Sequence, residues 1–408
     1  MRFQTIEKRP NWKSRADELG YLSTILDDPP YWVEALDQPF CAVFSLHEIE
    51  DVIESATEEI AELALQAVDY VVNGSRSDEL FERLKIPPMF REPIRKSWQR
   101  NDGSIYGRFD FSYNDGRLKL LELNFDTPTS LYEASVLQWF WLEDLKANGK
   151  LPDSADQFNS LHDRLIAAFK KNCRCNQLLH LTTIHDAPED EETVRYLESC
   201  AIQAGLQTSF LHLRDLGFDG GGHLVDLEGR RIEQLFKLYP WEFITIEEAY
   251  AQRAKGTRVF TRVIELHETS LFEPPWKLIL SNKAVLPLLW EIAPAHRFLL
   301  ESCYDDESGA AAKMRQRKHV RKPIFGREGG SVSIRDPASP LPVVQQKSTY
   351  GREGFILQDL HELPKHDDYH LVIGSWVVDG QPAGIGLRAD KSAITSNRAI
   401  FVPHYIEN

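Results

Sequence analysis

Four polar side chains stand out in a short segment whose pattern otherwise predicts a β-hairpin. Residues 106–130, YGRFDFSYNDGRLKLLELNFDTPTS, alternate aromatic residues, pass through Asn-Asp-Gly and continue into a leucine-rich run, as two strands joined by a tight turn do. If the loop is the three residues 114–116, with its glycine in the left-handed conformation, one face of the hairpin carries Arg108, Asp110, Glu122 and Asn124. A slip of one residue would separate the two halves of this set.

The chemistry of this predicted face is that of hard oxygen ligands. Asp110, Glu122 and Asn124 offer oxygen donors without histidine or cysteine, which suits Mg²⁺ better than zinc. Mg²⁺ completes its coordination shell with water and substrate phosphates, so such a site predicts a bound nucleotide. Arg108 would then stabilise a transferred phosphoryl group. The alternative is a buried network of ion pairs that only fixes the hairpin. Spacing alone does not decide between the two.

Further along the chain, two lysines and a glycine-rich turn have the character of a phosphate site. Lys283 precedes an apolar helix, and Lys322 and Arg327 lie in KPIFGREGGSVSI. Glycines there allow backbone amides to approach phosphates, and lysine supplies a point charge. Arg388 lies on a late predicted strand. No GxxxxGK[ST] motif occurs, so these features together describe an ATP site without a P-loop.

The elements that must position these residues change in character along the chain. The first hundred residues are predicted to be mostly helical, and residues 45–74 form a helix that opens with a capping box and closes at a glycine. Residues 177–213 have the strand–helix–strand pattern of a βαβ unit. The last third is predicted to form an antiparallel sheet, from residues 331–336, 354–360, 369–390 and 399–406. The fold class is therefore α/β.

An acidic loop, residues 185–192, follows the first strand of the βαβ unit. Five of its eight residues are Asp or Glu, and open α/β sheets bind ligands at the carboxyl ends of their strands. Docking of a cationic amine is one interpretation, with Asp186, Glu191 and Glu192 as the candidate residues. The other interpretation is that the acidic side chains complement the dipole of the following helix.

Composition narrows the classes of partner. The 408 residues carry a net charge of −15, which argues against nucleic acid or an anionic membrane as the main partner. No apolar run reaches the length of a bilayer span, and the N-terminus lacks the apolar core of a signal peptide. The five cysteines form no disulfide framework. We therefore expect a cytoplasmic protein with small-molecule substrates, and the sequence does not indicate its oligomeric state.

Five motifs in order resemble one known family: YGRFDFSYNDGRLKLLELNFDTPTS, LFKLYPWEF, EPPWKLILSNKAVLP, KPIFGREGG and FILQDLHELP. They are similar to the synthetase domain of glutathionylspermidine synthase and to its shorter bacterial relatives, which are described as acid–amine ligases. The resemblance runs from about Trp12 to the C-terminus. It implies an ATP-grasp fold with a Rossmann-like pre-ATP-grasp α/β domain and a helical N-terminal region. We expect three interlocked parts, residues 1–145, 146–260 and 261–408.

The resemblance also implies a role for each matching residue. Arg108 would be the catalytic residue that stabilises the phosphoryl group, and two magnesium ions would be bound by Asp110, Glu122 and Asn124. Residues 358–360 would form the adenine-side strand. Thr127 and Thr129 stand where the family has serines that line the site of the thiol peptide. The implied ATP-binding residues are Arg108, Asp110, Lys283, Lys322, Arg327, Gln358, Asp359, Leu360 and Arg388.

The implied activity is that of an ATP- and Mg²⁺-dependent carboxylate–amine ligase that works through an acyl phosphate. A glutathione-like peptide and a polyamine-like amine are the implied substrates, although threonine replaces serine at both acyl-site positions and Glu328 stands where a small or thiol residue is expected. The amidase domain of the bifunctional enzyme has no counterpart in the sequence, so no amidase activity is expected. The alternative function is a catalytically inactive protein of the same fold that binds a nucleotide or an amine.

Overall fold

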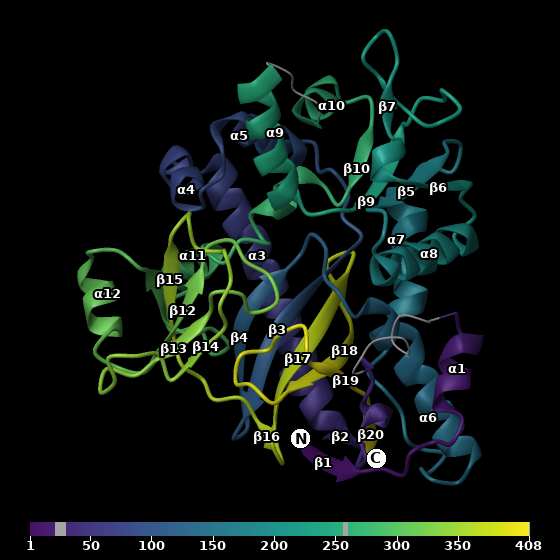
Figure 1. Cartoon of the computed structure of the whole chain (residues 1–408), viewed down its shortest axis with the longest axis vertical. Helices are drawn as coiled ribbons and strands as arrows, with labels where there is room; N and C mark the ends of the chain where they lie inside the picture. Colours follow the sequence, from purple (N-terminus) through teal and green to yellow (C-terminus); the bar gives the residue numbers. More distant parts are fainter. Residues whose placement is uncertain (21–29, 256–259, 408) are drawn as a thin grey trace.

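A six-stranded antiparallel sheet forms the centre of the computed structural model, which describes residues 1–20, 30–255 and 260–407 (Figure 1). The strand order is β19-β18-β17-β3-β4, and a short β16 pairs with β17. The strands are β3 (Tyr106–Asn114), β4 (Arg117–Asn124), β16 (Lys365–His366), β17 (Tyr369–Val378), β18 (Gln381–Asp390) and β19 (Ile400–Val402). The predicted hairpin thus pairs with strands from the end of the chain.

The register of the β3–β4 hairpin differs from the prediction near its turn. Asn114 pairs with Arg117, so the loop is the two residues Asp115 and Gly116, which have φ values of 50° and 70°, as a type I′ turn requires. The predicted three-residue loop is therefore wrong. Phe111 pairs with Leu120 but Asp110 pairs with Glu122, which leaves Leu121 as the extra residue of a β-bulge. The bulge restores the predicted common face, because Arg108 then pairs with Asn124.

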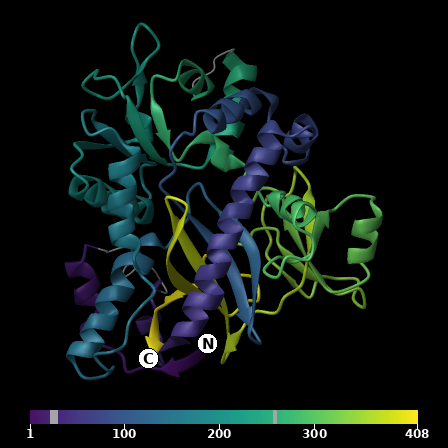
Figure 2. The same ribbon diagram turned by 180° about the vertical axis from the view of Figure 1, so that it is seen from behind.

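A long helix covers one face of this sheet, as seen from behind in Figure 2. It begins with a π-helical segment, η2 (Glu48–Glu54), and continues as the α-helix α3 (Ser55–Asn73). The predicted capping box is present, because the Ser45 amide donates to Glu48 at 3.0 Å and the Glu48 amide donates to Ser45 Oγ at 3.3 Å. Buried apolar residues of α3 join the same core cluster as Phe109, Phe111 and Ile373. Burial of this apolar stripe holds the helix against the sheet.

The N-terminal region is less uniformly helical than predicted. A three-stranded sheet joins β1 (Arg2–Thr5), β2 (Phe40–Ser45) and β20 (His404–Glu407), and β2 runs parallel to β20. This pairing brings the two ends of the chain together at the base of the molecule (Figure 1). The helical elements of the first half are α1 (Trp12–Glu18), η1 (Val33–Ala35), α4 (Ser77–Arg83), α5 (Pro88–Gln99), η3 (Glu133–Leu137), α6 (Gln138–Ala147) and α7 (Leu161–Asn172).

A four-stranded parallel sheet in the order β10-β9-β5-β6 confirms the predicted βαβ unit. Helix α8 (Pro188–Gln203) connects β5 (Leu179–Thr183) to β6 (Thr208–His212), and helix α9 (Trp241–Lys255) follows β9 (Gln234–Leu238). Both helices begin at the carboxyl ends of the strands, and both carry acidic residues in their first turns. The remaining elements are η4 (Leu213–Asp215), β7 (Gly217–Phe218), β8 (Leu224–Val225), α10 (Phe260–Leu266) and β10 (Ser270–Phe272).

The strands of the last third do not form one sheet, so that expectation is corrected. A five-stranded sheet in the order β11-β15-β12-β13-β14 stands beside the central sheet (Figure 1), β17 to β19 belong to the central sheet, and β20 pairs with β2. The elements are η5 (Pro275–Leu278), α11 (Val285–Ile292), β11 (Ser302–Tyr304), α12 (Gly309–Met314), β12 (His319–Pro323), β13 (Ser333–Arg335), β14 (Val344–Gln345) and β15 (Phe355–Asp359).

The predicted boundaries at residues 145 and 260 remain predictions. Hydrogen bonding joins the first and third predicted parts in two sheets, through β3 with β17 and through β2 with β20. Among the helices of the described ranges, none combines the length and the apolar character that crossing a bilayer requires.

Candidate functional site

The predicted polar residues lie on the sheet face opposite α3. On β3, Phe109 pairs with Ser375, whose Oγ lies 2.7 Å from Thr57 Oγ1 of α3. Because neighbouring side chains on a strand alternate in direction, Arg108 and Asp110 point to the other side. We call this side, with the lysines that approach it from the five-stranded sheet and from the segment before α11, the polar face.

The side chain of Arg108 extends over Gly374 of the neighbouring strand β17. Its Nε donates to Asp110 Oδ1 at 2.7 Å, its Nη1 donates to the carbonyl of Thr129, and its guanidinium carbon lies 5.4 Å from the ring centre of Trp376. A Cβ on Gly374 would lie 2.7 Å from Arg108 Cδ. The glycine therefore provides the space that the arginine side chain occupies.

The three predicted metal ligands are neighbours on the polar face. Asp110 accepts from Arg388 Nη2 at 2.6 Å and from Asn124 Nδ2 at 3.1 Å, and the same amide nitrogen lies 3.3 Å from Glu122 Oε1. Both Arg108 and Asp110 are buried. The bulged register thus brings all four residues of the predicted set together, with Arg388 as a fifth, while their roles remain predictions.

The two predicted lysines complete the polar face. Lys283 Nζ lies 3.3 Å from Glu122 Oε2 and donates to the carbonyl of Gly326 at 2.7 Å. Lys322 Nζ donates to the carbonyl of Leu121 and to Gln358 Oε1, both at 2.7 Å. The carbonyl that the bulge turns out of the β3–β4 ladder is therefore a partner of Lys322.

Positive charge exceeds negative charge on the polar face. Arg108, Arg388, Lys283 and Lys322 are four cations around two carboxylates, Asp110 and Glu122. Burial favours the neutral acid of Glu122, but Lys283, Lys322 and Arg388 outweigh it and hold the pKa of Glu122 well below its usual range. Ionised oxygen ligands beside surplus cations suit a divalent metal and a polyphosphate together. The residues present therefore fit Mg²⁺ and ATP.

Binding of Mg–ATP is expected to weaken as the pH rises above about 8. Burial lowers the pKa of Lys322 to about 8, with Glu122 partly opposing this, and only the protonated lysine attracts phosphate. The apparent affinity should therefore fall by up to about tenfold per pH unit above that value. Calorimetric titrations near pH 8 in buffers of different ionisation enthalpy should detect proton uptake on binding. Lys322→Arg, which stays charged, should flatten the profile; binding without proton uptake in the wild type would contradict the assignment.

Arg327, on the glycine-rich turn, reaches the segment that follows β4. Its Nη1 and Nη2 lie 3.0 and 3.1 Å from Thr127 Oγ1. The turn takes left-handed backbone conformations at Glu328 and Gly329, with φ of 52° and 68°. Thr129 contributes its carbonyl to Arg108. The two threonines predicted to line the acid site thus contact two arginines of the predicted ATP site.

Two carboxylates that the sequence reasoning did not select lie near Arg327. Burial raises the pKa of Asp190, on the first turn of α8, while Arg327 opposes this. Burial likewise raises the pKa of Glu242, on the first turn of α9, and Arg327 and Lys283 oppose it. We call these two carboxylates the acceptor wall. Asp190 lies within the acidic loop that the sequence singles out.

The other acidic candidates lie elsewhere. Asp186 is exposed, with its carboxylate 2.7 Å from His185 Nδ1, and Glu191 pairs with His212 and Arg195. Glu192 lies close enough to Tyr132 to help burial raise the pKa of that phenol to about 12. The structure therefore does not bring Asp186 or Glu191 to the polar face, and the acidic residue of the first α8 turn that interacts with Arg327 is Asp190.

The predicted adenine-side residues occupy the centre and the end of a strand. β15 pairs with β11 on one edge and with β12 on the other, so the backbone of Gln358 is inside the sheet. The Gln358 side chain supports Lys322, and Asp359 pairs with Arg317 at 3.2 Å. Leu360 follows the end of β15, so its backbone lies outside the hydrogen-bonded ladder of the sheet.

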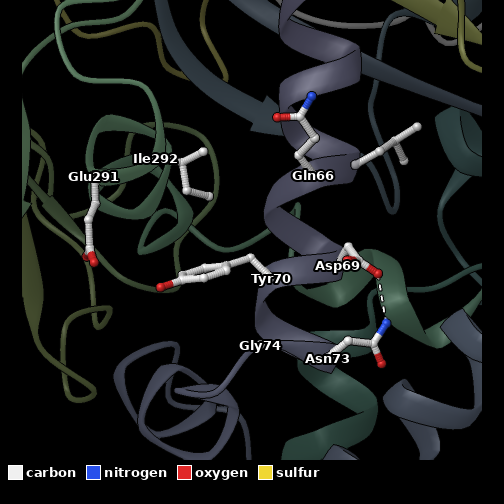
Figure 3. A pocket seen from close by; sticks show the side chains of 8 residues that line it. Gln66, Asp69, Tyr70, Asn73, Gly74, Glu291 and Ile292 are labelled. Atoms are coloured by element: carbon white, nitrogen blue, oxygen red, sulfur yellow. Dashed lines mark hydrogen bonds between the residues drawn. The ribbon is translucent and has the colours of Figure 1, made fainter.

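A surface groove of about 720 Å³ lies away from all of these residues (Figure 3). It runs between α3 and the end of α11, and Asn73 donates to Asp69 at 2.7 Å on its wall. Since α3 and the central sheet separate it from the polar face, it is not the predicted nucleotide site. Its lining residues are Leu65, Gln66, Asp69, Tyr70, Asn73, Gly74, Glu291 and Ile292.

A family model described as glutathionylspermidine synthase pre-ATP-grasp matches residues 3–407. The chain belongs to this family. It is 36% identical over 389 residues to a Haemophilus influenzae protein named as an inferred acid–amine ligase, and the match covers 93% of this chain and 92% of that protein. The family expectation from the five motifs is therefore confirmed.

Longer members of the same family match over part of their length. The bifunctional glutathionylspermidine synthetase/amidase of Escherichia coli is 30% identical over 367 residues, which cover 85% of this chain and 56% of that protein. Trypanothione synthetase of Crithidia fasciculata is 29% identical over 345 residues, covering 81% and 51%. A solved glutathione synthetase-like effector from Globodera pallida has a TM-score of 0.53 at 11% identity and covers 98% of both chains. The family and this likeness confirm the ATP-grasp type of α/β fold.

Proposed function

We propose that the protein is an ATP- and Mg²⁺-dependent carboxylate–amine ligase that activates a small acid as an acyl phosphate. The observation that carries this proposal is the polar face, where four buried or half-buried cations surround two carboxylates. The family, whose named members include synthetases and an inferred acid–amine ligase, supports the same class of ATP-dependent enzyme that forms C–N bonds.

In the proposed first half-reaction, a carboxylate oxygen of the acid attacks the γ-phosphorus of ATP, and the bond to the ADP oxygen breaks. Asp110, Glu122 and Asn124 would hold Mg²⁺, which supplies charge stabilisation to the phosphates. Arg108 would interact with the transferred group, and its contacts with Asp110 and with the carbonyl of Thr129 support this role. Such preorganised charge can contribute several orders of magnitude in rate.

In the second half-reaction, the amine nitrogen attacks the acyl carbon and orthophosphate leaves. A free amine is mostly protonated at neutral pH and must lose a proton to react. The acceptor wall suits this task, because burial raises the pKa of both Asp190 and Glu242. We infer that these carboxylates dock the ammonium group and that one of them receives its proton.

The substrates are proposed at the level of chemical class. Thr127 and Thr129 would line the site of the acid, and a glutathione-like peptide is the candidate that the family suggests. A polyamine-like amine is the matching candidate for the acceptor, since two carboxylates offer complementary charge. The name of the relative from Escherichia coli, a glutathionylspermidine synthetase/amidase, supports both choices.

The test measures ADP release from Mg–ATP with a panel of acids, with and without amines, and traps acyl phosphate with hydroxylamine. We expect ADP release that requires an acid, a hydroxamate when amine is absent, and an amide when it is present. Glutathione with spermidine forms one arm, and a metabolite extract analysed by mass spectrometry forms the other. Binding of Mg–ATP without acid-dependent ADP release in either arm would instead support the inactive nucleotide-binding protein.

A further inference from the structure

Four charged side chains are buried between the α/β layer and the end of the β3–β4 hairpin. They are Asp126, Lys237, Glu273 and Lys277, and their side chains are between 0% and 5% exposed. We call them the charge quartet. Its two cations and two anions balance, so, unlike the polar face, it has no surplus charge to offer a ligand.

The first pair joins β9 to the hairpin. Lys237 Nζ donates to Asp126 Oδ1 at 2.9 Å and to the carbonyl of Tyr239 at 2.9 Å. The other oxygen of Asp126 accepts the backbone amide of Trp241 at 2.5 Å, and Lys237 Nζ also lies 4.3 Å from the ring centre of Trp241. The start of α9 is therefore attached to the residue between Phe125 and Thr127.

The second pair joins β10 and η5 to the start of β3. Lys277 Nζ lies 2.5 Å from Glu273 Oε2 and donates to the carbonyl of Tyr106 at 2.5 Å. Glu273 Oε1 accepts the amides of Ile105 and Tyr106, both at 3.0 Å. The indole of Trp241 donates to the Glu273 carbonyl at 3.0 Å, so Trp241 connects the two pairs.

Three members of the quartet lie a few residues before a residue of the proposed site, because Asp126 precedes Thr127, Lys237 lies shortly before Glu242 and Lys277 lies shortly before Lys283. The fourth member, Glu273, accepts the amide of Tyr106, which lies two residues before Arg108. The polar face is centred on β3 and β4, the acid-site segment is the loop that follows β4, and the acceptor wall lies on the first turns of α8 and α9. The quartet attaches the start of α9, which carries Glu242, to that loop and to β3.

We propose that the charge quartet is a positioning device that holds the acceptor wall in register with the polar face. This proposal rests on the proposed function. Stability alone is a weak explanation for the quartet, because buried ion pairs are often no more stabilising than apolar side chains of similar volume. Geometry is a better one, since a displacement of about 1 Å between reacting groups can cost about 100-fold in rate. Hydrogen-bonded charges fix both distance and direction where apolar contacts would allow sliding.

The test is the double variant Asp126→Asn/Lys237→Met, which removes one pair without leaving a buried charge alone. Its Kd for Mg–ATP should stay within about threefold of the wild type, and acid-dependent ADP release should persist. Amide formed per ADP should fall at least about tenfold, because acyl phosphate that meets no aligned amine is hydrolysed. This ratio does not depend on the fraction of folded enzyme. An unchanged ratio would overturn the proposal.

A matched control and a second variant of the quartet keep the result decisive. Arg9→Met/Glu34→Gln removes another buried ion pair, of 2.6 Å, and should leave amide per ADP unchanged. If the double variant does not fold, Glu273→Gln/Lys277→Met removes the other pair, retains an acceptor for the amides of Ile105 and Tyr106, and should show the same uncoupling. A fall in the ratio of the Arg9/Glu34 control equal to that of the quartet variant would overturn the proposal, since any buried pair would then have the same effect.

Hydrogen exchange separates a failure of this proposal from a failure of the proposed function, because it needs no substrate. The quartet variant should exchange faster at residues 124–130 and 237–245 than the wild type, with β17 and β18 unchanged. Equal protection in those segments would overturn the positioning role whatever the wild type catalyses. Absence of acid-dependent ADP release in the wild type would instead overturn the proposed function.

Discussion

Arg108→Ala is expected to lower kcat by at least about 10³-fold, the range seen when an arginine that stabilises a transferred phosphoryl group is removed. The fold should persist, because Asp110 keeps its contacts with Arg388 and Asn124. Binding of Mg–ATP should weaken much less than turnover, since Arg388, Lys283 and Lys322 still offer positive charge. Steady-state kinetics, calorimetric titration and thermal unfolding together check this expectation.

Two further variants define the role of Arg108 more closely. Arg108→Lys keeps the charge but loses the planar fork that holds Asp110 and the Thr129 carbonyl together, so it should recover only part of the loss. As a control, Arg95→Ala removes an arginine of α5 that pairs with Asp78 of α4, and it should leave turnover near wild type. Normal turnover in Arg108→Ala would contradict the catalytic role.

Glu122→Gln is expected to separate the effect of the metal from that of the nucleotide. The substitution keeps the shape of the side chain but removes its charge, so the surplus of cations on the polar face increases. ATP without Mg²⁺ should therefore bind at least as tightly as it binds the wild type. The Mg²⁺ concentration needed for half-maximal activity should rise at least about 100-fold, the upper range for loss of a residue that only supports a metal ligand.

The control for Glu122→Gln is Glu301→Gln, a half-exposed carboxylate just before β11 that pairs with Arg317, just before β12. It should change neither ATP binding nor the Mg²⁺ requirement. Titrations with and without Mg²⁺ in both variants make the comparison. A Glu122→Gln enzyme with the Mg²⁺ requirement of the wild type would show that Glu122 only fixes the hairpin, which is the alternative that its spacing leaves open.

Local patterns predicted most of the elements that build the site. Aromatic alternation and the Asn-Asp-Gly turn located the β3–β4 hairpin, and the capping box located the start of the long helix. The bulge at Leu121 was outside the reach of these patterns, because an extra residue in one strand is a property of the pairing. The common face of the four polar residues was nevertheless predicted. The predicted and the observed pairing at these residues differ by two positions, and a shift of two keeps every side chain on the same face of the sheet.

Long-range pairing was the part that the sequence could not supply. The parallel contact of β2 with β20 and the division of the late strands among three sheets depend on segments hundreds of residues apart. Asp190 was missed for a related reason, because the docking of α8 decides which acidic residue of its first turn faces Arg327. Lys237 offered a signal that was overlooked, a single charge within the otherwise buried apolar strand QLFKL.

We expect the polar face to bind a divalent metal together with a triphosphate. The most direct test is anomalous diffraction from crystals grown with Mn²⁺ and a non-hydrolysable ATP analogue. We expect anomalous peaks between the phosphates and the side chains of Asp110, Glu122 and Asn124, with Lys283 and Lys322 on the phosphate oxygens. Manganese and nucleotide bound elsewhere, with the Arg108–Asp110–Arg388 contacts unchanged, would contradict this expectation.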